Sequence, residues 1–135
     1  MIVVDTSVWI DLFRGAKVAH VDYMREQLHS EVGEDFALTD IVLTEILQGL
    51  PENEVDMVER QMLEFPVLRL NGLEDFRRAA ALYRAARGRG VTIRRTTDCL
   101  IAAVCIRDEV PLLHRDVDFD RLAQHSELKI AEVQQ

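Results

Sequence analysis

The sequence predicts an α/β fold in a single domain over residues 1–135, with a central parallel β-sheet flanked by helices on both faces. Short apolar runs alternate along the chain with segments whose apolar residues recur at helical spacing. The strand candidates are continuously apolar, as in parallel strands that are buried on both faces. A length of 135 residues suits one compact domain, and no linker rich in Pro, Gly or Ser divides it.

One strand and two helices are predicted in the first third of the chain. Residues 2–4 form a buried strand, and Thr6 and Ser7 offer caps for a helix that Gly15 closes. A second helix follows, because apolar residues recur every three or four positions until Gly33 ends the pattern. Its predicted buried stripe consists of Val18, Val21, Met24, Leu28 and Val32.

Two further strands enclose two helices in the middle of the chain. Residues 36–38 form a strand, and Thr39 caps a helix that runs to about Gly49. Pro51 begins another helix in its first turn, where the missing N–H has no intrahelical partner to lose. The buried stripe of that helix is predicted to be Val55, Val58, Met62 and Phe65. Residues 67–70 are expected to form a strand.

The last part of the chain is predicted to hold three helices and two strands. A long helix ends near Gly88 and buries a face made of Leu73, Phe76, Ala80 and Tyr83. Thr96 and Thr97 cap a nearly all-apolar helix that must be buried all round. The remaining elements are expected as a strand over 112–114, a helix over 118–124 and a candidate final strand over 128–130.

Charge is distributed unevenly along the chain. The net charge of −8 argues against a protein that coats nucleic acid in general. Seven arginines and no acid lie between Phe76 and Thr97, which leaves 9 of the 16 basic residues against all 24 acidic residues elsewhere, a net of −15. These are Arg77, Arg78, Arg84, Arg87, Arg89, Arg94 and Arg95. The stretch is either a phosphate-facing surface or a solvated helix face plus a loop.

Several classes of protein are excluded by the composition. No apolar run approaches the roughly 18 residues that span a bilayer, so no membrane insertion is expected. The first strand begins at the initiator methionine with no basic segment before it, which favours a cytoplasmic location. Cys99 and Cys105 lie on different faces of one predicted helix and are expected to be reduced core residues. The four histidines show no zinc-ligand spacing.

Acidic residues in four separate segments are the candidates for chemistry. Asp5 follows the first strand, Asp98 begins the apolar helix, and Asp116 follows a late strand with Asp118 two residues on. Glu45 lies at the rim of an otherwise core-directed helix. Parallel strand ends converge on one crevice, where gathered carboxylates repel one another unless a divalent cation binds them. This conjunction indicates a metal-dependent enzyme that acts on phosphate.

Each acid also has a purely structural interpretation. Asp5 can cap the helix that follows it, and a negative charge at the position of Asp98 is favoured by the helix dipole. Of Asp116 and Asp118, one can cap a helix while the other is solvated. Glu45 can extend from its rim to water. The metal site is therefore supported by the four segments together and by no single acid.

These motifs, in this order and in a chain of this length, resemble those of the PIN-domain ribonucleases and, within them, the VapC toxins of bacterial toxin–antitoxin pairs. The similarity spans essentially the whole chain. It is carried by Ile-Val-Val-Asp-Thr-Ser-Val-Trp-Ile at 2–10, the helix with Glu45, Thr-Asp-Cys-Leu-Ile-Ala-Ala at 97–103, and Leu-Leu-His-Arg-Asp-Val-Asp-Phe-Asp at 112–120.

The resemblance implies metal-binding, catalytic roles for four acids, namely Asp5, Glu45, Asp98 and one of Asp116 and Asp118. Asp116 is preferred because it lies nearer the strand end, while Asp118 is the alternative, either as a ligand itself or through water. Small hydroxyl positions of the family, which orient carboxylates or hold water, are matched by Thr6, Ser7 and Thr97.

The predicted function is that of a Mg²⁺- or Mn²⁺-dependent endoribonuclease, the toxin of a toxin–antitoxin pair. One or two ions would lower the pKa of the attacking water and neutralise charge on the scissile phosphate. The resemblance also implies structured RNA, commonly tRNA, as the substrate, a cognate VapB-like antitoxin as a partner, and a homodimer.

Rival functions are weighed against the same residues. A phosphatase of the haloacid-dehalogenase type needs a second aspartate two residues after the first, where this chain has Ser7. A response-regulator receiver needs an acidic pair near the N-terminus, which is missing from this sequence. The alternatives that stay open are a housekeeping PIN nuclease, a non-catalytic PIN-like module that binds RNA or protein, and an α/β domain whose acids only cap helices.

Overall fold

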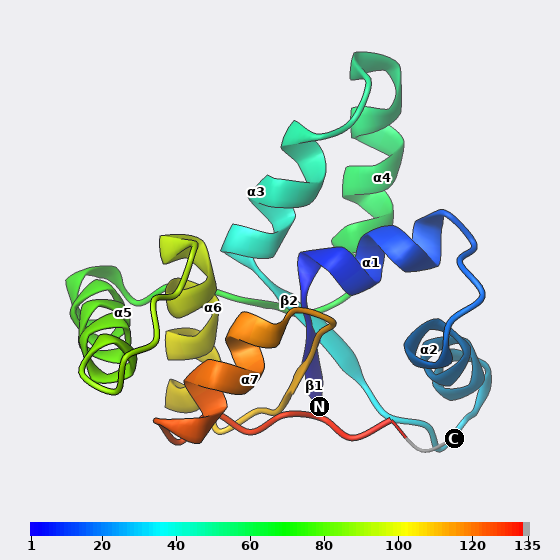
Figure 1. The fold of residues 1–135 in the computed structure, drawn as a ribbon. Helices are drawn as coiled ribbons and strands as arrows, with labels where there is room; N and C mark the ends of the chain where they lie inside the picture. The colour runs from blue at the N-terminus through cyan, green and yellow to red at the C-terminus, as the bar shows by residue number, and fades with distance from the viewer. Residues whose placement is uncertain (134–135) are drawn as a thin grey trace.

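The computed structural model describes residues 1–133 and contains a four-stranded parallel sheet in the order β3-β2-β1-β4 (Figure 1). The strands are β1 (Ile2–Val4), β2 (Phe36–Thr39), β3 (Val67–Leu68) and β4 (Leu112–Leu113). Val3 pairs with both Ala37 and Leu112, so β1 is a central strand. Every residue of β1, β2 and β4 is buried, as their continuous apolar runs predict.

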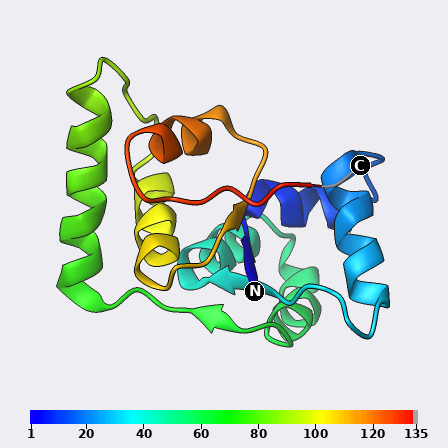
Figure 2. The same cartoon turned by 90° about the horizontal axis from the view of Figure 1, so that it is seen from below.

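Helices lie on both sides of this sheet, which confirms the predicted α/β architecture. Figures 1 and 2 show α5, α6 and α7 on one side and α1 and α2 on the other, and Figure 1 shows α3 and α4 projecting as a pair. The helices are α1 (Thr6–Phe13), α2 (Ala19–His29), α3 (Asp40–Gln48), α4 (Val55–Met62), α5 (Gly72–Arg87), α6 (Thr96–Arg107) and α7 (Val117–Gln124). Among residues 1–133, no helix has both the length and the apolar character to cross a membrane.

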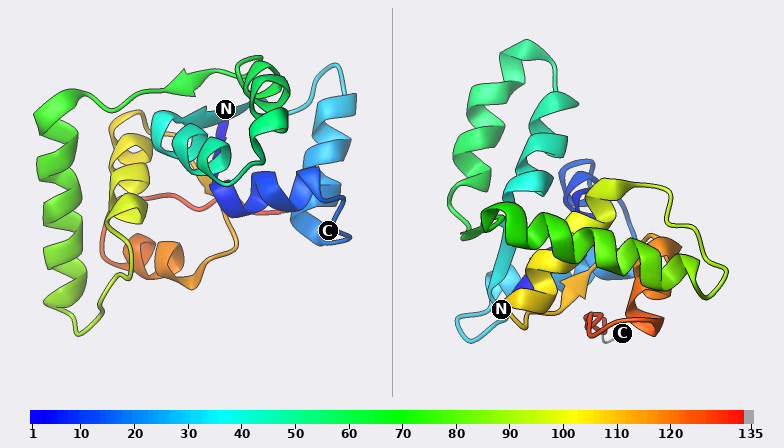
Figure 3. Two further views of the ribbon diagram at one scale, coloured as in Figure 1. Left: turned by 90° about the horizontal axis from the view of Figure 1, so that it is seen from above. Right: turned by 90° about the vertical axis from the view of Figure 1, so that its left-hand side faces the viewer.

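Helix α6 lies between α5 and the sheet (Figure 3). Its residues from Asp98 to Cys105 are all buried, so the expectation of a helix buried all round is confirmed. Cys99 and Cys105 are free thiols in this core, as predicted. Burial is the main reason why the pKa of Cys99 is raised to about 11 and that of Cys105 to about 12. Neither thiol is therefore activated for nucleophilic chemistry.

The predicted buried face of α5 is wrong. Leu73 is 68% exposed and Phe76 is 49% exposed, whereas the buried residues of the helix are Asp75, Ala79, Leu82 and Ala86. The physical reason is Asp75, which is fully buried because its carboxylate accepts from the Asn71 backbone N–H and pairs with Arg107 of α6. A hydrophobic pattern places an aspartate on the solvent side of a helix. The predicted buried face of α5 therefore differs from the face that contains Asp75 and is buried in the structure.

Helix α2 is shorter than predicted. It ends at His29, and Val32 is 94% exposed instead of buried. Gly33 is required for another reason, because a Cβ at this position would collide with the backbone carbonyl of Gln27. Gly15 does close α1 as predicted, with a left-handed φ of 67°.

The helix starts also differ in part from those predicted. The N-cap of α1 is Asp5, and Thr96 lies inside α6, whose N-cap Arg95 makes no capping bond through its side chain. Thr39 caps α3 as expected, since its hydroxyl oxygen accepts from the Val42 N–H at 3.1 Å. Pro51 precedes a 3₁₀ turn, Glu52–Glu54, before α4 begins.

Two predicted strands are reduced in the structure. Strand β3 stops at Leu68, because the Leu70 N–H donates to the Asp40 side chain at 3.1 Å instead of to a neighbouring strand. Of residues 128–130, only Ile130 forms a β-bridge, which is parallel and pairs with Leu112. The predicted domain of residues 1–135 includes 134 and 135, which lie outside the described residues.

Candidate active site

The candidate site lies where the chain order of the sheet reverses, between β1 and β4. Asp5 directly follows β1, and Asp116 follows β4 after two intervening residues. The Asp5 backbone N–H donates to the Leu113 carbonyl at 2.9 Å, which ties the two strand ends together. In an open α/β sheet the carboxyl ends of the strands form a crevice at such a switch point. The topology of the sheet therefore places both acids at the crevice where ligands bind in folds of this type.

An open cavity of about 270 Å³ at this position brings the predicted acids together. Its lining includes four carboxylates from four separate segments of the chain, namely Asp5, Glu45, Asp98 and Asp116. Asp118 is not among the lining residues. Asp5 and Asp98 are only 6% and 4% exposed, whereas Glu45 and Asp116 are partly open to solvent.

Two hydroxyl groups at the start of α1 hold two of these acids. Thr6 Oγ1 donates to Glu45 Oε1 at 3.0 Å, which links α1 to α3. Ser7 Oγ donates to Asp5 Oδ2 at 2.8 Å. These are the contacts expected of residues that orient carboxylates. Thr97 makes no side-chain hydrogen bond within residues 1–133.

Asp98 is the least satisfied acid of the cavity. Its Oδ2 atom is buried and has no hydrogen-bond partner among the described residues. Burial, reinforced by the negative charges of Asp5 and Asp116, raises the pKa of Asp98 to about 7. Burial also raises the pKa of Asp5 and of Glu45 above their ordinary values. The cavity thus resists holding all its carboxylates ionised without an added cation.

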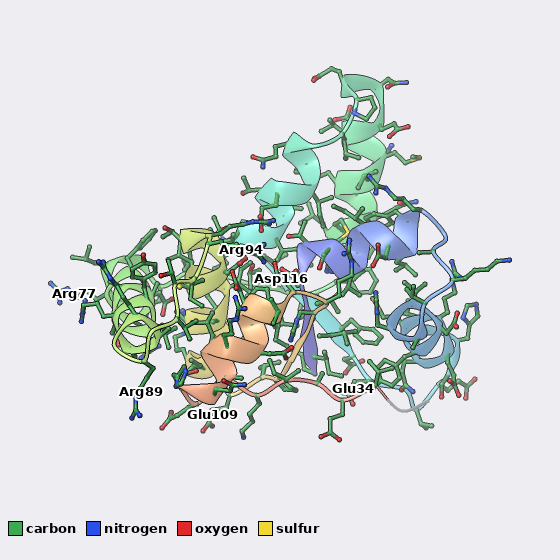
Figure 4. All side chains as sticks on the ribbon, in the orientation of Figure 1. Glu34, Arg77, Arg89, Arg94, Glu109 and Asp116 are labelled. Atoms are coloured by element: carbon green, nitrogen blue, oxygen red, sulfur yellow. The ribbon has the colours of Figure 1, made fainter. Side chains whose placement is uncertain are left out.

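Arg94 lies beside Asp116 (Figure 4) and joins it to Asp118. Its Nη2 donates to Asp116 Oδ1 at 2.9 Å, and its Nε donates to Asp118 Oδ2 at 3.0 Å. Asp116 also caps α7, because its Oδ1 accepts from the Asp118 N–H at 3.0 Å. The His114 Nδ1 accepts from the Asp116 N–H at 2.9 Å. The loop after β4 is therefore fixed around Asp116.

Asp118 has the contacts of a structural anchor. The residue is fully buried, and its carboxylate accepts from the Arg94 backbone N–H at 3.1 Å as well as from the Arg94 and Arg121 guanidinium groups. Burial alone would raise the pKa of Asp118, but the bonds from Arg94 and Arg121 outweigh it and the pKa lies below its usual value. Its oxygen atoms are already engaged by donors.

The donor set of the cavity suits a hard divalent cation. All four lining acids offer carboxylate oxygens, and the unpartnered Asp98 Oδ2 is the kind of buried atom that an ion satisfies. Within residues 1–133, no three His, Cys, Asp or Glu side chains are grouped closely enough to hold one ion as they stand. Asp116 is held by Arg94, so an ion would compete with that guanidinium.

Arginines also line the cavity, and the sequence pattern indicates only some of them. Arg14, Arg95 and Arg115 line it together with the acids. The Arg115 Nε pairs with Asp11 Oδ2 at 2.7 Å, and the position of Arg115 directly before Asp116 is the signal that could have identified it. Of the seven clustered arginines, only Arg95 lines this cavity.

The other clustered arginines lie in different surroundings, so the stretch is not one surface. Figure 4 shows Arg77 and Arg89 pointing away from the body of the molecule. Arg78 pairs with Asp75 at 3.5 Å. Arg84 borders a separate apolar groove of about 440 Å³ between α5 and α6, whose lining includes Phe76 and Tyr83. That groove is larger than the acidic cavity but contains no carboxylate.

Comparison with known proteins gives consistent results. Residues 2–124 match the PIN domain. Ribonuclease VapC11 of Mycobacterium tuberculosis and a VapC ribonuclease of Mycobacterium bovis are each 41% identical over 133 residues, which covers 97% of this chain and 98% of the relative.

Solved structures of similar fold include the DNA-bound VapBC of Salmonella typhimurium, with a TM-score of 0.73, 15% identity and 96% coverage of both chains. VapBC-1 of nontypeable Haemophilus influenzae has a TM-score of 0.72, 16% identity and 98% coverage of both chains. At these identities the structural similarity concerns the fold.

Proposed function

This chain belongs to the PIN-domain family and within it to the VapC ribonucleases, the toxins of VapBC toxin–antitoxin systems, and we propose that it cleaves structured RNA with the help of Mg²⁺ or Mn²⁺. The observation that carries the metal proposal is the cavity lined by four carboxylates, in which Asp98 Oδ2 has no partner among residues 1–133. A non-catalytic module would have no need to keep four mutually repelling acids at one strand-end crevice.

The ligands we propose are Asp5, Glu45, Asp98 and Asp116. When bound, one or two divalent ions would lower the pKa of the attacking water and neutralise charge on the phosphate. Asp116 is preferred to Asp118 because it lines the cavity, whereas the Asp118 oxygens accept bonds from Arg94 and Arg121.

The remaining residues of the site orient these acids. The hydroxyl groups of Thr6 and Ser7 fix the carboxylates of Glu45 and Asp5, and Arg94 fixes that of Asp116. Groups that are oriented before substrate binds need no reorganisation during the reaction. Thr6, Ser7 and Arg94 therefore contribute to catalysis by keeping these carboxylates in position during turnover.

Two partners complete the proposal. The similar solved structures are toxin–antitoxin complexes, which supports a cognate VapB-like antitoxin. We propose RNA as the substrate from the names of the relatives, and tRNA as the particular RNA from the family resemblance. Action on such an RNA also favours a cytoplasmic location.

A homodimer is the proposed assembly. The observation that favours it is the outer face of α5, where Leu73 is 68% exposed and Phe76 is 49% exposed. Large exposed apolar side chains beside an apolar groove are typical of a surface that another chain covers. Size-exclusion chromatography with light scattering should give twice the chain mass, and the double variant Leu73→Glu/Phe76→Glu should give the monomer mass.

Cleavage of RNA by the purified protein tests the proposed function. The chain and its Asp5→Asn variant are incubated with total RNA in Mg²⁺, in Mn²⁺ and in EDTA, and the new RNA ends are sequenced. We expect defined ends, in tRNA, only from the unaltered chain with a divalent ion. Asp5→Asn keeps the shape of the side chain but removes its charge, so circular dichroism should remain unchanged. Cleavage that persists in EDTA or in folded Asp5→Asn would refute the metal mechanism.

A further inference from the structure

Two arginines at the rim of the acidic cavity have no side-chain partner among the described residues. Arg14 at the end of α1 and Arg95 at the N-cap of α6 both line the cavity and are exposed. Neither makes a side-chain hydrogen bond or an ion pair with any residue of the described range 1–133. The third lining arginine, Arg115, is already paired with Asp11. Arg14 and Arg95 thus present free guanidinium groups to whatever enters the cavity.

The charge of the cavity explains why such groups are needed there. Four carboxylates line it, so their negative charges outnumber the two positive charges of one bound divalent cation by about two and would repel an incoming phosphate unless cationic side chains offset them. The net charge of the whole chain, −8, adds to this repulsion. Arg94 offers little relief, because its guanidinium is engaged by Asp116 and Asp118. Among residues 1–133, the unpaired cations that line the cavity are those of Arg14 and Arg95.

We infer that Arg95 binds the phosphate at the bond to be cleaved and that Arg14 binds a neighbouring phosphate of the same RNA strand. The inference rests on the proposed ribonuclease function and assigns phosphate-binding residues to it. A planar guanidinium with several N–H donors suits the non-bridging oxygens of a phosphate.

The two arginines differ in their distance from the acids. Arg95 is close enough to Asp98 and Glu45 for its charge to oppose the rise in pKa of both carboxyls. Arg14 lines the same cavity from the C-cap of α1, at the opposite end of that helix from Asp5. Arg95 therefore lies beside the proposed metal ligands, and Arg14 lies further along the path of the bound RNA strand.

Cleavage kinetics of Arg95→Gln and Arg14→Gln test this assignment. The matched control is Arg77→Gln, because Arg77 is exposed on α5 and points away from the site (Figure 4). We expect Arg95→Gln to lower kcat by about 100-fold, as for the loss of one donor to a developing charge. Arg14→Gln should mainly raise KM, and Arg77→Gln should change neither constant. Arg95→Lys, which keeps the charge but not the planar fork, should fall between Arg95→Gln and the unaltered chain.

RNA binding supplies a readout that does not depend on turnover. Affinity for a labelled RNA hairpin is measured by fluorescence anisotropy at several salt concentrations, in the Asp5→Asn background so that the RNA stays intact. Each lost phosphate contact should reduce the slope of log affinity against log salt by about 0.7. Thermal shifts with Mn²⁺ should be no smaller in Arg95→Gln than in the unaltered chain, because no metal ligand is removed.

The outcomes separate this inference from the proposed function. If the unaltered chain cleaves RNA but Arg95→Gln and Arg14→Gln match Arg77→Gln in rate and salt slope, the assignment of the arginines is wrong and the ribonuclease function stands. If Arg95→Gln loses its Mn²⁺ response, the residue is structural and the inference also fails. If the unaltered chain neither cleaves nor binds RNA, both are overturned.

Discussion

At the scale of single residues, the two aspartates after β4 have opposite surroundings. Asp116 lines the cavity and is partly exposed, whereas Asp118 is fully buried and bonded to Arg94 and Arg121. Spacing along the chain cannot separate two acids that lie two residues apart. Burial and bonding predict different roles for them, and two isosteric substitutions measure the difference.

We expect Asp116→Asn to abolish cleavage and to change the free energy of unfolding by less than about 1 kcal/mol, since Asn can still cap α7 and a partly exposed ion pair is worth little to stability. Asp118→Asn should lower the free energy of unfolding by about 3 kcal/mol, because it leaves buried donors of Arg94 without their charged acceptor. Urea unfolding and RNA cleavage are measured on both variants. A stable Asp118→Asn protein that no longer responds to Mn²⁺ would make Asp118 the ligand instead.

Asp98 should make the stability of the metal-free protein depend on pH. Its pKa is raised from 3.8 to about 7 in the folded state, chiefly by burial, so between these values the folded chain holds a proton that the unfolded chain releases. The free energy of unfolding should therefore fall as pH rises from about 4 to about 7, by up to about 4 kcal/mol.

Urea unfolding in EDTA at pH 5 and pH 7.5 measures this dependence. Asp98→Asn should flatten it, while Asp22→Asn, an exposed position on α2, should leave it unchanged. Divalent ions compete with the proton, so metal affinity should rise over the same pH range. Equal slopes in Asp98→Asn and Asp22→Asn would show that the raised pKa of Asp98 contributes nothing to stability.

At the scale of elements, α5 shows how a buried charge can mislead a hydrophobic pattern. Leu73, Phe76, Ala80 and Tyr83 have regular helical spacing, yet the helix packs through Asp75, Ala79, Leu82 and Ala86. The inward aspartate is stabilised by Arg107, which lies 32 residues further along the chain. One long-range ion pair therefore decides which face of this helix meets α6.

A matched pair of leucine truncations tests the orientation of α5. Leu82 is 9% exposed and Leu73 is 68% exposed on the same helix. Leu82→Ala should lower the free energy of unfolding by about 2–4 kcal/mol, because it removes buried methyl groups and leaves a cavity. Leu73→Ala should cost less than about 0.5 kcal/mol when measured at a protein concentration where the chain is monomeric. Similar losses for both variants would contradict the structure of this helix.

At the scale of the whole molecule, cationic and acidic groups meet at one strand-end cavity while apolar residues remain exposed on α5. The two features suit different partners. A cationic side chain of an antitoxin can enter the acidic cavity, while a second copy of this chain covers the apolar face of α5 in the proposed dimer.

Co-expression with the small open reading frame beside its gene tests this partnership. We expect the two chains to purify together, growth to be rescued and RNA cleavage to be suppressed. The complex should also lose the Mn²⁺-dependent thermal shift of the free chain, because a cationic group would occupy the carboxylates. Separate purification of the two chains with no rescue of growth would argue for a housekeeping nuclease instead of a toxin.

The sequence by itself determined the parallel sheet, the buried helix α6 and the four acidic segments of the site. These features depend on local patterns, since buried strands read as continuous apolar runs and acids after such strands must lie at one sheet edge. The contact of Ser7 with Asp5 also follows from its position two residues further along the chain.

Only the tertiary structure decided which of Asp116 and Asp118 faces the cavity, which face of α5 is buried and which arginines stand free. Each of these depends on partners distant in sequence, such as Arg94 for Asp118 and Arg107 for Asp75. A charged side chain can be buried when an oppositely charged side chain pairs with it. Such a pair between residues distant in sequence forms only in the folded chain.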